Sequence, residues 1–114
     1  MSKYTRKLQF NKKTKELIYK RENGQCFFCK QGYFLKNKDP LQYQIKDIMH
    51  YIPKSSSGLG VEENGVLGCR YHHSLLDNGN KGLRKEMLGK MKVYLKSIYP
   101  DWNEEKLVYQ KYSF

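Results

Sequence analysis

All three cysteines and all three histidines of this chain fall into three short segments, and this grouping limits what the chain can fold into. The segments are Cys26-Phe27-Phe28-Cys29, His50, and Cys69-Arg70-Tyr71-His72-His73. Two pairs with C-x-x-C or C-x-x-H spacing, far apart in sequence, are typical of a tetrahedral zinc site, because each pair forms a tight turn that offers two ligands. His50 and His73 then remain free for a second, catalytic site.

The chain has 114 residues, which predicts a single domain over 1–114. The hydrophobic core of such a small domain often needs an additional cross-link for stability, and a structural zinc ion would supply one. Three cysteines suit a Cys3His zinc site better than a framework of disulfides. No apolar run is long enough for a signal peptide or a membrane span, so we expect a soluble protein of a reducing, cytoplasmic compartment with no membrane partner.

The charge balance points to a polyanionic partner. Lys and Arg number 22 against 11 Asp and Glu, for a formal net charge of +11. Such an excess favours nucleic acid, although a basic surface that serves only solubility is the plain alternative. Arginine is the usual bidentate reader of guanine edges, and the chain has few, namely Arg6, Arg21, Arg70 and Arg84. We therefore expect binding through the phosphate backbone and shape, with modest sequence preference.

The first part of the chain is predicted to be a basic arm followed by a helix. Residues 1–11 show no hydrophobic periodicity and form the arm. Residues 12–22 have a helical pattern, with Leu17 and Ile18 on the apolar side and Asn23-Gly24 as the stop signal. A metal-binding turn at Cys26–Cys29 follows, and residues 36–40 are expected to be a loop.

The middle of the chain is predicted to contain two strands and a helix. A β-rich, partly alternating run spans residues 43–52 and ends at Pro53. Residues 54–60, with three serines and two glycines, are expected to be an open loop, and 65–68 a short return strand. A short helix over 70–77 would be closed by Asn78-Gly79.

Residues 81–114 are predicted to form C-terminal helices. An apolar stripe at 3.6-residue spacing indicates a helix that packs on the core, and Pro100 ends it. Asp101-Trp102-Asn103-Glu104 has the form of a capping box that opens a last short helix. The stripe consists of Leu83, Met87, Met91, Tyr94, Leu95 and Ile98.

A strand, a loop, a return strand and a helix carry His50, Asn64, His73 and Asp77 in that order, and on these residues the sequence resembles the HNH endonuclease family. The resemblance covers residues 12–80 and implies an α+β fold, a zinc-stapled ββα-metal core flanked by N- and C-terminal helices. The matching stretches are Arg21-Glu22-Asn23-Gly24-Gln25-Cys26-x-x-Cys29, Met49-His50-Tyr51-Ile52-Pro53-Lys54-Ser55, Gly58-Leu59-Gly60-Val61-Glu62-Glu63-Asn64-Gly65 and Cys69-x-x-His72-His73-x-x-x-Asp77. The third stretch is most similar to small phage-encoded members.

The resemblance assigns catalytic roles. His50 matches the general base, whose imidazole can take a proton from water near neutral pH. His73 and Asp77 match the ligands of a catalytic divalent cation such as Mg²⁺, Mn²⁺ or Ni²⁺, and their four-residue spacing puts them on one helix face. Asn64 matches the asparagine that pins the loop bearing the base or supplies an oxygen to the metal. Each assignment has a plain alternative. His50 could be a core histidine, His73 and Asp77 could form a surface salt bridge, and Asn64 could be a turn asparagine.

The structural zinc ion would be held by Cys26, Cys29, Cys69 and His72. The usual family version has a fourth cysteine where this chain has His72, and Cys3His is an ordinary zinc set. A swap of roles between His72 and His73 stays open at this point, because the two are adjacent.

The main departure from the family pattern is Met49. Many members carry Asp or His immediately before the general base as a third ligand of the catalytic cation, and a thioether is too soft for Mg²⁺. Water and substrate phosphate could complete the shell, or Asp47, two residues back on the same strand face, could reach in. Weak metal binding and a slow or inactive enzyme are the third outcome.

We therefore expect a metal-dependent DNA endonuclease that leaves 5′-phosphate and 3′-hydroxyl ends, in the cytoplasm of a bacterial or phage-infected cell. The ββα element would enter the minor groove of double-stranded DNA, with Lys54, Arg70 and the lysines of both flanking helices on phosphates. One such site nicks one strand, so paired cuts would need a second subunit or a partner such as a phage packaging protein. The alternative is a zinc-stapled DNA-binding module that is catalytically weak or inactive; a pure interaction domain is a third, weaker possibility.

Overall fold

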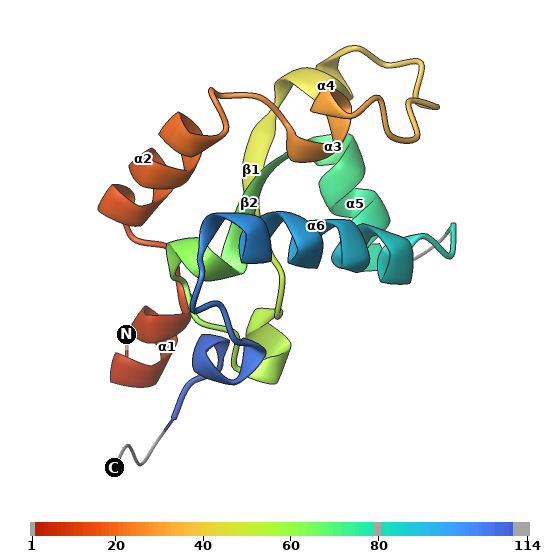
Figure 1. The fold of residues 1–114 in the computed structure, drawn as a ribbon. Coiled ribbons are helices and arrows are strands. Elements are labelled where there is room, and N and C mark those ends of the chain that lie inside the picture. Colours follow the sequence, from red (N-terminus) through yellow and green to blue (C-terminus); the bar gives the residue numbers. More distant parts are fainter. Residues whose placement is uncertain (1, 79–80, 111–114) are drawn as a thin grey trace.

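A two-stranded antiparallel sheet lies at the centre of the molecule and is surrounded by helices (Figure 1). The computed structural model describes residues 2–78 and 81–110. The sheet is formed by β1 (Lys46–His50) and β2 (Gly65–Cys69), in a register that places Lys46 opposite Cys69 and His50 opposite Gly65. The α+β class expected from the sequence is confirmed.

The two faces of the sheet bury different sets of side chains. Met49 and Val66 are paired across the strands and belong to the larger core, which also contains side chains of α5 (Arg70–Asn78) and α6 (Arg84–Ile98). Ile48 and Leu67 form the next pair, and they pack with Phe10 and Ile18 in a smaller cluster. Because neighbouring strand residues point to opposite faces, each face has its own helical cover.

The helix α2 (Lys12–Arg21) confirms the first predicted helix. Asn11 caps it, since its Oδ1 accepts a hydrogen bond from the Thr14 amide at 2.8 Å. It ends before Asn23 and Gly24, whose φ angles of 56° and 67° lie in the left-handed region. Ile18 is fully buried as expected, whereas Leu17 is 45% exposed, so its assignment to the apolar side was wrong.

The N-terminal arm is more ordered than its lack of periodicity indicated. Residues Lys3–Leu8 form α1, capped by Ser2, and the arm buries Leu8 and Phe10. Both apolar side chains fall near the end of the arm, too few and too close together to produce a helical stripe. The prediction of a simple basic arm was therefore wrong.

The predicted first strand was too long. Residues Leu41–Gln44 form α4, and only Lys46–His50 are strand. The preceding Asp39 accepts a hydrogen bond from the Leu41 amide, and Pro40 adopts helical dihedral angles, so local turn chemistry overrides the β propensity of this segment. The loop after β1 also contains two short 3₁₀ helices, η1 (Lys54–Ser56) and η2 (Glu62–Asn64).

The remaining predicted elements agree with the structure, with two exceptions. The metal-binding turn is α3 (Phe27–Lys30), the return strand is β2, and Met87, Met91 and Leu95 of α6 are fully buried. The capping box at 101–104 was wrong, because Asn103 caps the last helix, η3 (Glu104–Leu107), by accepting from the Glu105 amide. Gly79 of the predicted Asn78-Gly79 stop lies outside the described residues.

Both ends of the described chain pack on the loop between β1 and β2 (Figure 1). The Gly60 amide donates to the Lys7 carbonyl, and the Leu59 amide donates to the Leu107 carbonyl. Gly58 also pairs with Val108 in an isolated bridge. A Cβ on Gly60 would lie 2.2 Å from the Gln9 carbonyl carbon, so only glycine allows this close approach. The loop is thus enclosed by α1 and the C-terminal segment.

A buried ion pair joins α2, β2 and α6. Glu22 is 1% exposed, and its carboxylate accepts from Arg21 Nε at 2.8 Å and from the Tyr94 hydroxyl at 2.7 Å. The Arg21 guanidinium also donates to the carbonyls of Glu62 and Gly65. These bonds hold the segment that enters β2.

Replacing Glu22 by Ala should destabilise the protein strongly, because it leaves the Arg21 guanidinium without its buried counter-ion. We expect a loss of about 3–5 kcal/mol in the free energy of unfolding, measured by urea denaturation. Glu16→Ala, on the exposed side of the same helix, is the matched control and should change stability by no more than about 0.5 kcal/mol. Equal effects of the two substitutions would contradict this account.

Candidate functional site

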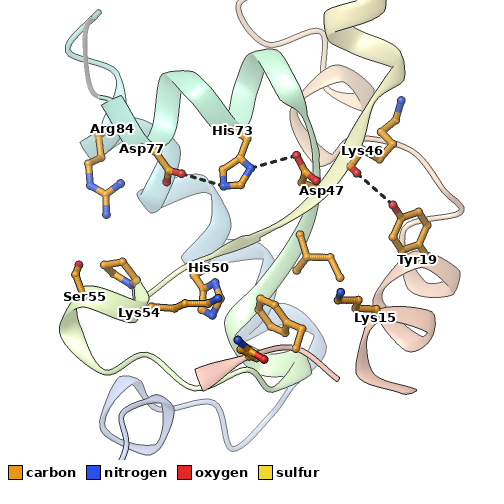
Figure 2. Close-up of a pocket in the computed structure, with 14 residues that line it drawn as sticks. Lys15, Tyr19, Lys46, Asp47, His50, Lys54, Ser55, His73, Asp77 and Arg84 are labelled. Carbon is orange, nitrogen blue, oxygen red and sulfur yellow. Dashed lines mark hydrogen bonds and ion pairs between the residues drawn. The ribbon is translucent and has the colours of Figure 1, made fainter. Parts of the chain in front are cut away.

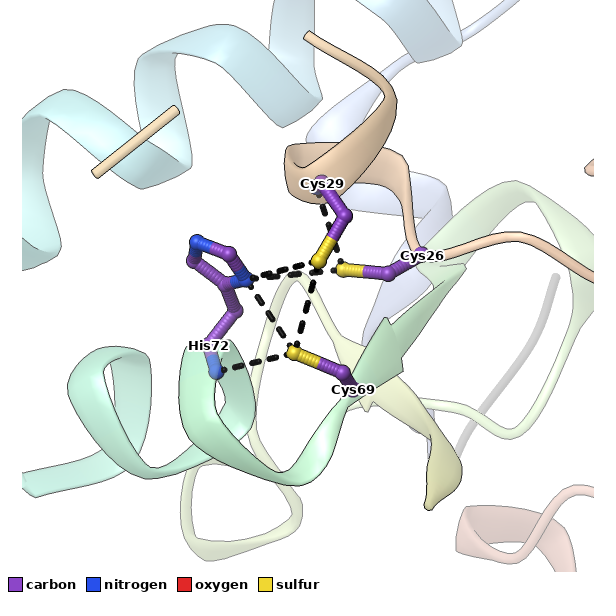
Figure 3. Close-up of side chains that lie close together, drawn as sticks. All are labelled: Cys26, Cys29, Cys69 and His72. Carbon is purple, nitrogen blue, oxygen red and sulfur yellow. Dashed lines mark hydrogen bonds between the residues drawn. The ribbon is translucent and has the colours of Figure 1, made fainter. Parts of the chain in front are cut away.

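Three cysteines and one histidine meet where α3, β2 and α5 converge (Figure 3). The Sγ atoms of Cys29 and Cys69 lie 3.7 Å apart, and His72 Nδ1 lies 3.6, 3.5 and 3.2 Å from the sulfurs of Cys26, Cys29 and Cys69. A tetrahedral zinc shell with ordinary bond lengths has sulfur–sulfur edges of about 3.8 Å and sulfur–nitrogen edges of about 3.6 Å. The donor set and spacing therefore fit a zinc ion.

The ring orientation of His72 suits metal binding and settles which histidine joins the cysteines. His72 Nε2 lies 2.6 Å from the Tyr33 carbonyl oxygen, which only accepts, so Nε2 carries the proton. Nδ1 then keeps its lone pair and faces the sulfurs, an arrangement common for histidine ligands. His73 lies outside the cluster, so the sequence assignment of His72 to the zinc set is the one that the geometry supports.

Hydrogen bonds and burial shift the pKa values of the three thiols in opposite directions. A hydrogen bond with Cys69 lowers the pKa of Cys26 to about 3, while burial raises the pKa of Cys29 to about 11. The hydrogen bond to Cys26 and burial raise the pKa of Cys69. A zinc ion bound to all three sulfurs would displace the protons that the thiols carry.

A second group of predicted site residues lines an open cleft of about 1070 Å³ beside β1 (Figure 2). His50 at the end of β1 lies on the floor of this cleft, and His73 and Asp77 project from α5. The structure therefore brings together three of the four residues predicted to be catalytic. The cleft is lined by Gln9, Phe10, Lys15, Tyr19, Lys46, Asp47, Ile48, His50, Pro53, Lys54, Ser55, His73, Asp77 and Arg84.

The N-terminal segment holds the His50 ring. His50 Nε2 donates to the Leu8 carbonyl at 3.0 Å, so Nδ1 carries the free lone pair. The Phe10 ring packs against the imidazole, with centroids 4.3 Å apart. Burial lowers the pKa of His50 below its ordinary value of 6.5; the hydrogen bond to the Leu8 carbonyl opposes this shift in part, and the Lys54 ammonium lowers the pKa by a smaller amount. The neutral base form is thus the main one at pH 7.

His73 lies between two carboxylates. Its Nε2 is 3.0 Å from Asp77 Oδ2, and its Nδ1 is 3.6 Å from Asp47 Oδ2 (Figure 2). Asp47 lies on the same strand face as Met49, the face that meets α5. Asp47 was considered as a third metal ligand in place of Met49. It lies beside His73, on the opposite side of the ring from Asp77.

Met49 is fully buried and does not approach the cleft. A Cβ added to Gly68, directly beside it, would lie 2.4 Å from the Met49 sulfur, so the thioether fills the space that this glycine leaves.

Among the described residues, the Cys3His cluster is the one group of three or more His, Cys, Asp or Glu side chains close enough to share an ion.

Asn64 is buried behind the cleft and bonds only to the loop backbone. Its Oδ1 accepts from the Ile52 amide at 2.8 Å, and its Nδ2 donates to the carbonyls of Ile52 and Leu59. These bonds bind the two ends of the loop that follows His50. The geometry therefore supports the positioning role for Asn64 and leaves no amide oxygen for a metal.

The two predicted DNA contacts are placed differently. Lys54 lines the cleft, whereas Arg70 is exposed at the start of α5 and is not among the lining residues. Lys15, one of the flanking-helix lysines expected on phosphates, also lines the cleft, whereas Tyr19, Lys46 and Arg84 line it and were missed as site residues. No motif marks them, because they come from elements whose positions relative to His50 only the fold determines.

The described helices include none that is both long and apolar enough to cross a bilayer. The chain matches no protein-family model, and comparison with curated proteins and with solved structures also gives no match.

Native protein should contain one zinc ion per chain, and substitution of a cluster residue should remove it. We expect Cys69→Ser and His72→Ala to lose the metal and to unfold at a much lower temperature, because the ligands connect residues 26 and 69 of the chain. Metal analysis and thermal unfolding measure this. His73→Ala is the matched control and should keep its zinc; loss of zinc from His73→Ala alone would exchange the roles of the two histidines.

The imidazole of His50 should titrate below pH 6.5, and its pKa should rise when the Phe10 ring is removed. Phe10→Leu admits water to the imidazole and relieves the burial that lowers the pKa. Nuclear magnetic resonance titration of the histidine ring protons measures both values. Tyr4→Leu alters the same N-terminal segment at a residue that packs on Tyr109 instead, and it should leave the pKa of His50 unchanged.

Proposed function

We propose that this protein is a metal-dependent DNA endonuclease of the HNH type. The observation that carries the proposal is the single basic cleft in which His50 faces His73 and Asp77, next to a Cys3His cluster that anchors the same helix. The order of strand, loop, strand and helix is that of the ββα-metal core. A structural role alone gives no reason for an imidazole with a free nitrogen to face a cationic groove.

His50 is the proposed general base. The Leu8 carbonyl accepts from Nε2, so Nδ1 is the atom that takes a proton from the attacking water. The lowered pKa keeps this nitrogen unprotonated over a wider pH range than that of a free imidazole. Asn64 supports the base indirectly, because its amide closes the loop that begins directly after His50.

His73 and Asp77 are the proposed ligands of the catalytic cation. The 3.0 Å distance between His73 Nε2 and Asp77 Oδ2 equals about one edge of an octahedral shell with bonds near 2.1 Å. A divalent cation such as Mg²⁺, Mn²⁺ or Ni²⁺ supplies Lewis-acid stabilisation of the phosphate and the leaving 3′ oxygen. Asp47, on the far side of the ring, is suited to accept from Nδ1–H and so to orient His73.

The expected product is a nick with 5′-phosphate and 3′-hydroxyl ends, because one chain offers one such site. The proposed substrate is double-stranded DNA. Cleavage of both strands then requires a second subunit or a partner protein, as the resemblance to small phage enzymes implies.

The burial of Met49 favours a second candidate, a DNA-binding module without efficient cleavage. With Met49 in the core, a catalytic cation held by His73 and Asp77 would have two protein ligands instead of three. The basic cleft and the Cys3His cluster serve binding equally well. The two candidates differ in one respect, which is whether the chain breaks phosphodiester bonds.

Conversion of supercoiled plasmid to the nicked form, with Mg²⁺, Mn²⁺ or Ni²⁺ added, distinguishes the two candidates. We expect the wild type to nick and His50→Ala to be roughly 100- to 10,000-fold slower, the usual contribution of a general base, with DNA binding retained. Activity should fall on the acid side below pH 6.5, because protonation of His50 removes the base.

Ser56→Ala, an exposed change in the loop after His50, is the control and should nick like the wild type. Nicking by His50→Ala at the wild-type rate would exclude the proposed base. Absence of nicking by the wild type with every cation, together with salt-sensitive DNA binding, would favour the binding module.

A further inference from the structure

We propose that Lys15 and Arg84 bind DNA phosphates on either side of the phosphate that is cut, so that the sugar–phosphate backbone crosses the cleft from α6 to α2. This inference rests on the proposed function and identifies how that site holds its substrate. Neither residue belongs to a motif, and they lie 69 positions apart in the sequence (84 − 15).

Four cations in the described part of the chain line the cleft, and they are spread along it: Arg84, Lys54 beside His50, and Lys46 and Lys15 towards α2 (Figure 2). Figure 2 shows Arg84 beside Asp77 and Lys15 on the α2 side, with His50 between them. Two carboxylates flank His73, namely Asp77 of α5 and Asp47 of β1. A phosphate directly beside these carboxylates is repelled unless a cation intervenes, so the protein's own attraction for the backbone must come from the lining cations, of which Arg84 and Lys15 lie on opposite sides of His50 (Figure 2).

Arg84 is held in place before any ligand binds. Its Nη1 donates to the Leu76 carbonyl at 2.7 Å, and the side chain is half-buried. One N–H group of the guanidinium is used in this way, and the remaining donors are available to a phosphate at the cleft surface. A fixed guanidinium loses less conformational freedom on binding than a free side chain does.

Lys15 provides the charge at the other end. The residue is exposed on α2, and within residues 2–78 and 81–110 its ammonium makes no hydrogen bond or ion pair. Lys46, the neighbouring cation, is less suited, because its ammonium already donates to the carbonyls of Tyr43 and Gln44. Lys15 is therefore the available phosphate donor on this side.

The experiment measures binding of a short fluorescent DNA duplex by anisotropy, without a catalytic cation, for Lys15→Gln and Arg84→Gln. Each should bind roughly three- to tenfold more weakly, and each should reduce the slope of log affinity against log salt by about 0.9 between about 50 and 200 mM salt. Lys13→Gln and Lys85→Gln remove the same charge from exposed positions of the same helices outside the cleft lining. They should have a clearly smaller effect.

Arg84→Lys separates charge from geometry, because it keeps the charge and loses the bond to Leu76; its affinity should fall between those of the wild type and Arg84→Gln. Zinc content and melting temperature show whether each variant is folded. Equal weakening by the cleft variants and their controls would overturn the inference, since binding would then depend on net charge alone. The readout needs no cleavage, so a wild type that binds through these residues without nicking would refute the endonuclease and leave the phosphate contacts standing.

Discussion

The Cys3His cluster is the constraint on which the rest of the structure depends. Its ligands come from the turn after α2, the last residue of β2 and the first turn of α5, so they join three elements whose buried side chains share the larger core. Because His72 is held to the sulfurs, the neighbouring His73 must point away from the cluster, across α5. The cluster therefore sets the direction in which His73 and Asp77 project, and a chain this short has few other means to do so.

Adjacent residues of β1 lie on opposite faces of the sheet and have different surroundings. Met49 and His50 point to opposite faces, and the first fills the core beside Gly68 while the second meets the N-terminal segment. A shift of one residue in the register would bury the imidazole and expose the thioether. The pairing of His50 with Gly65 prevents this, and the Phe10 ring occupies the space that a side chain at Gly65 would need.

The sequence reveals the parts whose chemistry is local. Spacing alone identified the metal cluster, and periodicity identified α2 and α6 and the buried residues Ile18, Met87, Met91 and Leu95. It could not place Lys15 or Arg84 in the cleft, because that depends on how the helices pack. It also missed the roles of Leu8 and Phe10, since a backbone carbonyl that accepts a hydrogen bond leaves no mark in the residue pattern.

In the proposed endonuclease, the N-terminal segment would connect substrate binding and catalysis. The Leu8 carbonyl selects which nitrogen of His50 is free, and a few residues later α2 presents Lys15 to the same cleft. The loop on the other side is tied to this segment by the hydrogen bond from the Gly60 amide to the Lys7 carbonyl. A displacement of the segment would therefore change the orientation of the proposed base and one end of the proposed phosphate path together, so in this proposal the basic arm acts through its backbone as well as through its charge.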